Sequence, residues 1–119
     1  MLPGYQHKTG QGFDTRVGKI WKEGGQKISY DIGCLAGEYA KRDRMEDFSW
    51  YKEATVEGQE FRVARYKEGG FMSGILVVTI PGAAANFFAS AKTDEEVADA
   101  LLMLTGYRGK IDCTNNRLG

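Results

Sequence analysis

The sequence predicts an α+β fold, in which an antiparallel sheet carries a C-terminal helix on one face. Three segments indicate this class: two β-rich stretches joined by Glu57-Gly58, a strongly apolar stretch at 71–80, and an amphipathic stretch at about 94–105. The chain has 119 residues, a length that supports one hydrophobic core. We therefore expect a single domain over residues 1–119, with about five or six strands in a largely meandering sheet.

Composition and charge narrow the function classes. The 16 Lys and Arg residues balance 16 Asp and Glu residues, and 42% of the chain is hydrophobic. These values are typical of a soluble globular domain, and a net charge of zero gives no long-range field for collecting a polyanion. Nucleic acid is therefore not an expected partner. No stretch approaches the roughly 18 apolar residues of a membrane span, so no membrane association is expected.

The cysteines and the only histidine of the sequence indicate no catalytic or metal site. Cys34 and Cys113 are too far apart in sequence for a CxxC pair, and free thiols in a reducing cytoplasm are the simplest expectation. A disulfide between them is left open. Residues 1–16 hold few apolar side chains, so we expect a loose N-terminal arm, and His7 within it lacks the rigid surroundings that catalysis needs. No cofactor or metal is expected.

A hairpin and a less clearly defined segment are expected after this arm. Residues 17–21 and 27–32 are β-rich on either side of a glycine-containing turn, which predicts a hairpin. The segment at about 35–46 has apolar residues at helical spacing, which favours a second helix. Gly37 counts against that helix, because glycine costs about 1 kcal/mol relative to alanine. An extended segment is the alternative.

The segments 48–56 and 59–66 are expected to form a second hairpin. Gly58 suits a type I′ turn, which needs positive φ at both central residues. That turn sets a register in which Glu53 faces Arg62. An opposite-charge pair on the face that water can reach supports this register over a slip by one residue.

The two faces of this hairpin differ in character. Trp50 faces Arg65 on a mainly apolar side, and Phe48 is expected to extend that side. Tyr51 and Tyr66 lie on the other side. The first face is therefore expected to pack against the core.

Residues 71–80 are expected as a strand inside the sheet. If Tyr66 pairs with Phe71, then Ile75 and Val77 extend the face that carries Tyr51. Alternate residues of the same segment are also apolar, so both of its faces need cover. Exposing that surface would forfeit about 25 cal/mol per Å².

The last elements are a strand and a helix. Residues 84–91 are expected as the final strand. The helix at about 94–105 has Thr93 as its N-cap, and Glu96 completes a capping box. Residues 107–119 are polar and are expected to be a frayed tail.

The leading functional expectation is a non-enzymatic protein that acts by protein contact. If the segment at 35–46 fails to cover the second sheet face, that face must be shared with another subunit, so we expect a homodimer. The residues expected to contact a partner are Tyr51, Arg62, Tyr66, Phe71, Ile75 and Val77.

The alternative expectation is a small-molecule or enzymatic pocket between the sheet and the helix. Tyr30, Trp50 and Arg65 would line this pocket. An indole beside a guanidinium suits an anionic or aromatic ligand. Plain cross-strand packing of Trp50 on Arg65 is the simpler interpretation of the same pair.

Overall fold

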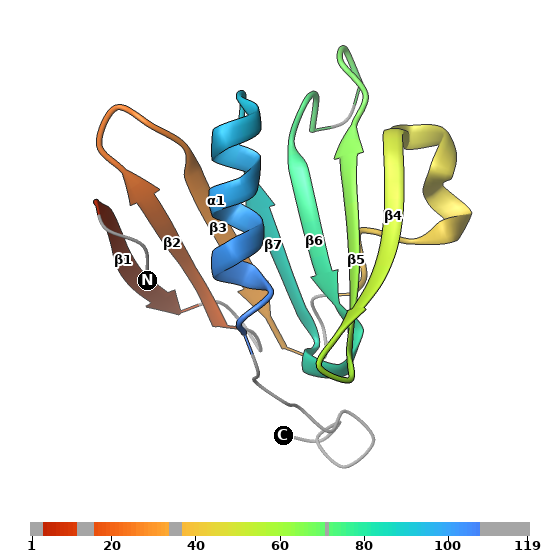
Figure 1. Ribbon diagram of the computed structural model, residues 1–119, viewed down its shortest axis with the longest axis horizontal. Coiled ribbons are helices and arrows are strands. Elements are labelled where there is room, and N and C mark those ends of the chain that lie inside the picture. Colours follow the sequence, from red (N-terminus) through yellow and green to blue (C-terminus); the bar gives the residue numbers. More distant parts are fainter. Residues whose placement is uncertain (1–3, 12–15, 34–36, 71, 108–119) are drawn as a thin grey trace.

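The computed structural model describes residues 4–11, 16–33, 37–70 and 72–107 (Figure 1). These residues form one seven-stranded antiparallel sheet with a helix packed on one face, which confirms the α+β class. The helix is α1 (Asp94–Leu104). The strands are β1 (Tyr5–Gln11), β2 (Arg16–Lys22), β3 (Lys27–Ile32), β4 (Phe48–Val56), β5 (Gln59–Tyr66), β6 (Leu76–Ile80) and β7 (Ala85–Ala89).

The sheet consists of two meanders that meet side by side. Its strand order is β1-β2-β3-β7-β6-β5-β4, and all neighbouring pairs are antiparallel. The expected meander is therefore present twice, and β3 and β7 join the two parts. The number of strands exceeds the expected five or six because part of the expected arm is a strand.

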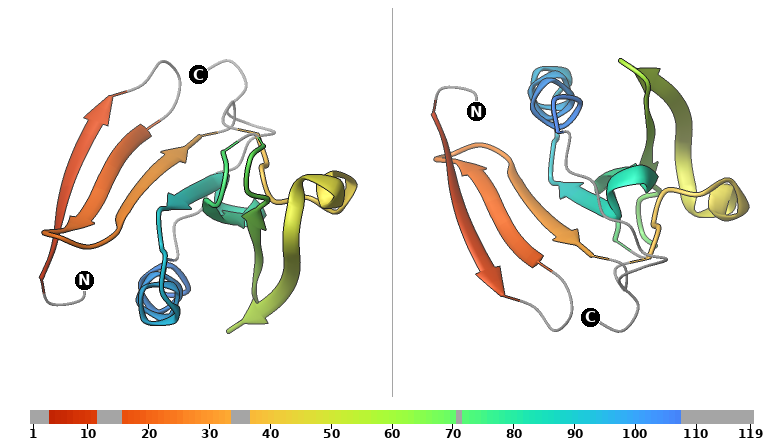
Figure 2. Two further views of the ribbon diagram at one scale, coloured as in Figure 1. Left: turned by 90° about the horizontal axis from the view of Figure 1, so that it is seen from above. Right: turned by 90° about the horizontal axis from the view of Figure 1, so that it is seen from below.

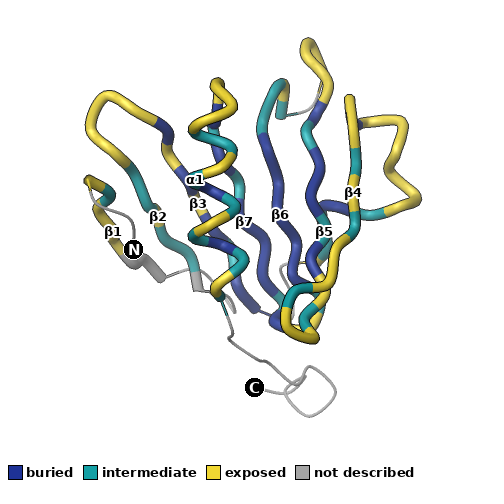
Figure 3. The backbone as a smooth tube through the Cα atoms, viewed as in Figure 1, coloured by how far each residue is buried: buried dark blue, intermediate teal, exposed yellow. Residues whose placement is uncertain are grey.

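The sheet bends around α1, so the helix lies in its concave face (Figure 2). We call this the inner face and the opposite side the outer face. Burial is greatest along the middle strands and decreases toward β1 and β4 (Figure 3). The inner core combines alternate residues of these strands with the apolar stripe of α1, and its largest buried side chains include Ile28, Phe61, Leu76, Val78 and Ile80.

The β4–β5 hairpin has the predicted register from Val56–Gln59 to Trp50–Arg65. Glu57 and Gly58 have φ of 50° and 82°, as a type I′ turn requires. A bulge between Phe48 and Trp50 then shifts the pairing by one residue. Such a shift moves the side chains on the N-terminal side of the bulge to the opposite face. Phe48 therefore packs on the outer face instead of the inner one.

Strand β6 is an interior strand, as predicted, but it is shorter than residues 71–80. All five of its residues are buried. The Tyr66 amide donates to the Ile75 carbonyl at 2.9 Å, so the pairing partner of Tyr66 lies four residues beyond the expected Phe71. Arg65 contacts the loop between β5 and β6, because its guanidinium donates a hydrogen bond to the Gly74 carbonyl at 2.7 Å. Phe71 itself lies outside the described residues.

The structure differs from the expected loose arm, because residues 5–11 form the edge strand β1. Its alternate residues are mostly polar, which explains why they gave no pattern of apolar burial. Specific contacts hold the strand in place. Tyr30 Oη lies 2.7 Å from His7 Nε2, and Gln26 Nε2 donates to the Tyr5 hydroxyl at 2.8 Å. Tyr30 can reach β1 because Gly18 has no side chain, since a Cβ there would lie 2.2 Å from the phenol oxygen.

The segment expected as a second helix at 35–46 contains no α-helix among its described residues. Residues 37–41 cross the outer face, and we call them the strap. A short 3-10 helix, η1 (Arg42–Asp47), follows the strap and leads into β4. Gly37 has φ of 76°, a left-handed conformation that ends any regular helix there. Residues 34–36, including Cys34, lie outside the described part of the chain.

The C-terminal elements follow the prediction. The expected last strand at 84–91 appears as β7, and α1 begins after Thr93, whose hydroxyl accepts a hydrogen bond from the Glu96 amide at 3.1 Å. The Glu96 carboxylate accepts from the Lys92 amide, one residue before the expected N-cap amide. Residues 108–119, which hold most of the expected tail and Cys113, lie outside the described residues. Among the described helices, none has the length and apolar character needed to cross a bilayer.

Candidate functional site

The outer face divides into two halves. The outer surface of β7, β6, β5 and β4 lies beneath the strap and η1, and we call it the covered half. Among the described residues, no segment covers the outer surface of β1, β2 and β3, and we call this surface the open half. Cross-strand pairing connects the two, because one row of paired residues runs through Lys8, Lys19, Ser29, Phe88, Val77, Ala64 and Tyr51.

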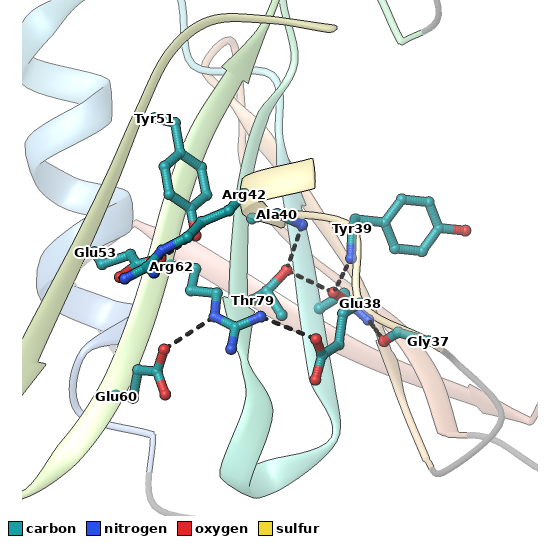
Figure 4. Close-up of polar contacts among 11 residues, drawn as sticks. Gly37, Glu38, Tyr39, Ala40, Arg42, Tyr51, Glu53, Glu60, Arg62 and Thr79 are labelled. Atoms are coloured by element: carbon teal, nitrogen blue, oxygen red, sulfur yellow. Dashed lines mark hydrogen bonds and ion pairs between the residues drawn. The ribbon is translucent and has the colours of Figure 1, made fainter. Parts of the chain in front are cut away.

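Two buried polar residues attach the strap to the sheet (Figure 4). Asn86 Oδ1 accepts from the Tyr39 amide at 3.2 Å and from the Thr79 hydroxyl at 2.7 Å, and Asn86 Nδ2 donates to the Gly37 carbonyl at 2.8 Å. The Thr79 hydroxyl in turn accepts from the Ala40 amide at 2.9 Å. Asn86 and Thr79 are 0% and 1% exposed, so these bonds replace water for groups that the fold buries.

A carboxylate on β4 organises the charged groups beside the strap. Glu53 accepts two hydrogen bonds of 2.6 Å from the Arg42 guanidinium and a third of 2.6 Å from the Tyr51 hydroxyl. Arg42 and then Tyr51 stabilise the ionised carboxylate, and they lower the pKa of Glu53 to about 2. Burial and the hydrogen bond to Glu53 raise the pKa of Tyr51 to about 12. Both groups therefore keep one protonation state at neutral pH.

The neighbouring Arg62 bridges two further carboxylates. Its Nε donates to Glu60 at 2.9 Å, and its Nη1 donates to Glu38 of the strap at 2.9 Å. Glu38, Glu60 and Arg62, which Figure 4 labels, line a hollow of about 470 Å³. Its other lining residues are Lys41, Arg42, Asp43 and Glu53. Arginines and carboxylates around this hollow already bond one another. We therefore interpret these side chains as a charge network that fixes the strap and η1 to the sheet.

The described residues of the set expected to contact a partner share the outer face, but the strap covers some of them. Val77 is 0% exposed and Tyr66 is 1% exposed, and both pack in the outer core with Ala40 of the strap. Ile75 is partly buried against the same cluster. Tyr51 and Arg62 belong to the charge network, and Phe71 lies outside the described residues. Among the described members of this set, Tyr66 and Val77 are therefore buried, and Tyr51 and Arg62 are engaged in the charge network.

The residues of the alternative pocket are dispersed. Tyr30 on β3 is separated from β4 by β7, β6 and β5, and it packs against Phe87. Trp50 and Arg65 are cross-strand partners, as predicted. Arg65 uses its guanidinium to hold the backbone, since Nη1 donates to the carbonyls of Gly74 and Ala91 at 2.7 and 3.0 Å. The structure thus brings Trp50 and Arg65 together without Tyr30.

The open half displays positive charge around partly exposed apolar side chains. Lys27, Ser29 and Asp31 point outward because the residues between them pack in the inner core. Their pairing partners on β2 also point outward, and among them Lys19 is exposed while Trp21 and Val17 are partly exposed. Lys8 pairs with Lys19 and is exposed. Of the outward side chains described on these three strands, Lys8, Lys19 and Lys27 carry positive charge and Asp31 alone carries negative charge.

A shallow hollow of about 340 Å³ lies in this open half. Its lining is mostly apolar and includes Val17 and Phe88, and the charged residues Lys8, Lys19 and Asp31 also line it. Phe88 is held from the other side by Tyr39 of the strap, in an edge-to-face contact with ring centroids 4.9 Å apart. The hollow therefore has one wall that is fixed by the covered half.

Another hollow, of about 560 Å³, lies where α1 begins. Gln26 is its buried member, at 1% exposure, and its amide nitrogen donates to the Tyr5 hydroxyl and to the Glu96 carbonyl. Lysines and carboxylates of both signs surround this opening. Gln26 lies in the turn before β3, and its contacts join this turn to β1 and α1, which gives this region a structural role.

Comparisons with protein-family models, curated proteins and solved structures give no match to this chain. The described residues also contain no group of three or more His, Cys, Asp or Glu that could hold a metal ion. The function must therefore be argued from the surfaces of the chain itself.

Sequence reasoning missed the open half as a candidate site. Lys8 falls within the expected loose arm, and Lys19 and Trp21 fall within the expected hairpin. Alternation did contain a signal, because Lys19 and Trp21 are spaced two apart and therefore share a face. Assembling that face requires the pairing of β1 with β2, which the polar sequence of β1 does not indicate.

Proposed function

We propose that this chain is a non-enzymatic binding protein that contacts an acidic protein segment through the open half of its outer face. The observation that carries the proposal is the contrast in charge and cover between the two halves. On the covered half, arginines and carboxylates pair with one another. On the open half, three exposed lysines and one aspartate surround partly exposed apolar side chains. Such a surface is suited to a partner of negative charge.

A protein partner fits this surface better than a nucleic acid does. Asp31 stands within the face, and the chain as a whole has a net charge of zero. Binding to a phosphate backbone gains most of its affinity from many cationic contacts, which this face does not supply. Protein interfaces combine aromatic and aliphatic side chains with a polar rim, and Trp21, Val17 and Phe88 provide such a centre.

Val77 is 0% exposed within a single chain, where it packs with Ala40 of the strap. A second copy of the chain is therefore not needed to cover Val77. Association of two copies stays a prediction to be measured, and a cytoplasmic location stays a prediction as well. Sedimentation of the purified chain tests the first of these directly.

The proposed contact can be mapped with defined probes. An acidic peptide containing one leucine, a basic peptide of equal length and a single-stranded oligouridylate are titrated into ¹⁵N-labelled protein. We expect the acidic peptide alone to shift the amides of β1, β2 and β3. The variant Lys8→Glu/Lys19→Glu/Lys27→Glu should weaken this binding by about tenfold or more, because it replaces attraction by repulsion.

The control variant is Lys52→Glu/Lys67→Glu/Lys92→Glu. It changes the net charge equally at three exposed lysines outside the open half, so its affinity for the acidic peptide should fall much less. Equal losses in the two variants, or shifts confined to other strands, would contradict the proposal. Tighter binding of the oligouridylate at the open half would favour a nucleic-acid partner, and concentration-dependent dimerisation through this face would favour a second copy.

A further inference from the structure

The hollow in the open half suggests which part of an acidic partner this face would hold. It lies on the row that runs from Lys8 and Lys19 through Ser29 to Phe88. The lysine pair stands at the β1 side of this row, and the aromatic ring stands at the β7 side. A partner side chain in the hollow would therefore have positive charge on one flank and an apolar wall on the other.

We infer that the hollow receives one large apolar side chain of the acidic segment, while the acidic residues beside it lie over Lys8 and Lys19. This inference rests on the proposed function, because it specifies how the same face would be used. Interfaces commonly gain most of their affinity from one or a few side chains in desolvated pockets, and surrounding polar contacts add orientation. The shallow 340 Å³ hollow, with Val17 and Phe88 in its lining, offers a place for such a side chain on the open half.

Rigidity of the wall supports this assignment. Phe88 belongs to a five-residue strand between β3 and β6, and Tyr39 of the strap packs on its ring. An anchor side chain would therefore meet a surface already ordered in the free protein, so little conformational entropy would be lost on its side. The lysines can move more freely around that fixed wall because they are exposed.

The position of Asp31 indicates how an acidic segment would be oriented over the hollow. It pairs with Val17 on the outer face, one row away from the Lys19–Ser29 pair. Carboxylates of a partner are attracted to the row of Lys8 and Lys19 and repelled from the row of Asp31. The acidic residues of the bound segment should thus lie toward the lysine row, and a residue without negative charge should lie near Asp31.

Two peptides that differ only at the central residue separate the contribution of the apolar side chain to binding from that of the acidic residues. An acidic peptide with one central leucine is compared with the same peptide carrying serine at that position, by fluorescence anisotropy of a dye on the peptide. We expect the leucine peptide to bind the wild-type protein at least about tenfold more tightly. The variant Ser29→Phe fills the hollow from an exposed position on β3 and should remove this preference.

The matched control is Thr55→Phe, which adds the same ring at an exposed position of the β4 edge strand. It should preserve the preference for leucine. A further variant, Asp31→Asn, should tighten binding of the leucine peptide several-fold, because it removes a like charge from the face. That gain cannot arise from a failure to fold, so it keeps the inference testable if Ser29→Phe is unstable.

The outcomes distinguish this inference from the proposed function. If lysine reversal weakens both peptides but Ser29→Phe leaves the leucine preference intact, the anchor assignment is wrong and the acidic contact stands. If lysine reversal has no effect on either peptide, the proposed function fails as well. Unchanged or weaker binding to Asp31→Asn would contradict the direction assigned to the bound segment.

Discussion

The covered half and the open half of the outer face differ in how their side chains meet water. Both lie on the side of the sheet away from α1, and rows of paired residues run from one half into the other. The covered half has apolar residues such as Val77 and Ala64, and the chain supplies a strap to bury them. The open half carries lysines at the matching positions, where exposure has little cost. The comparison shows that the chain covers those strands whose outward side chains are apolar and leaves exposed those whose outward side chains are charged.

The largest effect is expected where the strap is attached. Asn86→Ala removes three hydrogen bonds to and beneath the strap, and it leaves the buried Thr79 hydroxyl and Tyr39 amide without an acceptor. Each buried polar group without a partner costs about 1–3 kcal/mol. We expect the free energy of unfolding to fall by about 3 kcal/mol in urea denaturation, with faster hydrogen exchange at Ala40.

Ser29→Ala is the control for that substitution, because Ser29 is a small polar residue at an exposed position on the same face. Its stability should stay within about 0.5 kcal/mol of the wild type. If Asn86→Ala were equally mild, the hydrogen bonds of Asn86 would not be what holds the strap. The difference between the two halves would then not depend on this buried amide.

A smaller effect is expected in the charge network, and it depends on pH. The pKa of Glu53 is about 2 in the folded protein, below its ordinary value of 4.5. Its ionised form therefore stabilises the fold above about pH 4.5, and this contribution is lost as the pH falls toward 2. Glu53→Gln should lower the melting temperature at pH 7 and reduce the further drop between those two pH values.

Glu46→Gln, at an exposed glutamate of η1, serves as the control and should retain the wild-type pH profile. Tyr51 supplies a second readout. Burial keeps its pKa raised, but loss of the Glu53 carboxylate should bring it down from about 12. Ultraviolet titration of the phenol would detect this change, and an unaltered titration would place Tyr51 outside the network.

The smallest effect is expected on the open half. Lys8→Ala/Lys19→Ala removes two neighbouring like charges from an exposed row, so the free energy of unfolding should change by no more than about 0.5 kcal/mol. Chemical denaturation at low and moderate salt would measure it. A loss of several kcal/mol would mean that these lysines support the fold, and the proposal of a binding face would lose its basis.

Sequence reasoning succeeded where short-range chemistry decides the structure. The turn at Glu57 and Gly58 set the β4–β5 register, and Thr93 marked the start of α1. It failed where distant polar contacts decide. The bulge at Ser49 moved Phe48 to the other face, and Asn86 held an extended strap where helical spacing suggested a helix.

The candidate site was predicted less well than the fold for the same physical reason. The shared face of Tyr51, Arg62 and Val77 followed from alternation, and the structure has it. Whether that face is free depends on the strap, whose position is set by contacts about forty residues apart in the chain, such as that between Ala40 and Thr79. The open half needed β1, and β1 is ordered by Tyr5 and His7 through polar contacts rather than by apolar burial.

The position of β7 between β3 and β6 has a consequence for synthesis of the chain. While the ribosome is still translating residues before Ala85, the β1–β3 hairpins and the β4–β6 meander can each form, yet neither can join the other. Each partial sheet then presents an unpaired strand at what will become its centre, and unpaired apolar strands invite association with other chains. Insertion of one late, five-residue strand ends that exposure on both sides at once.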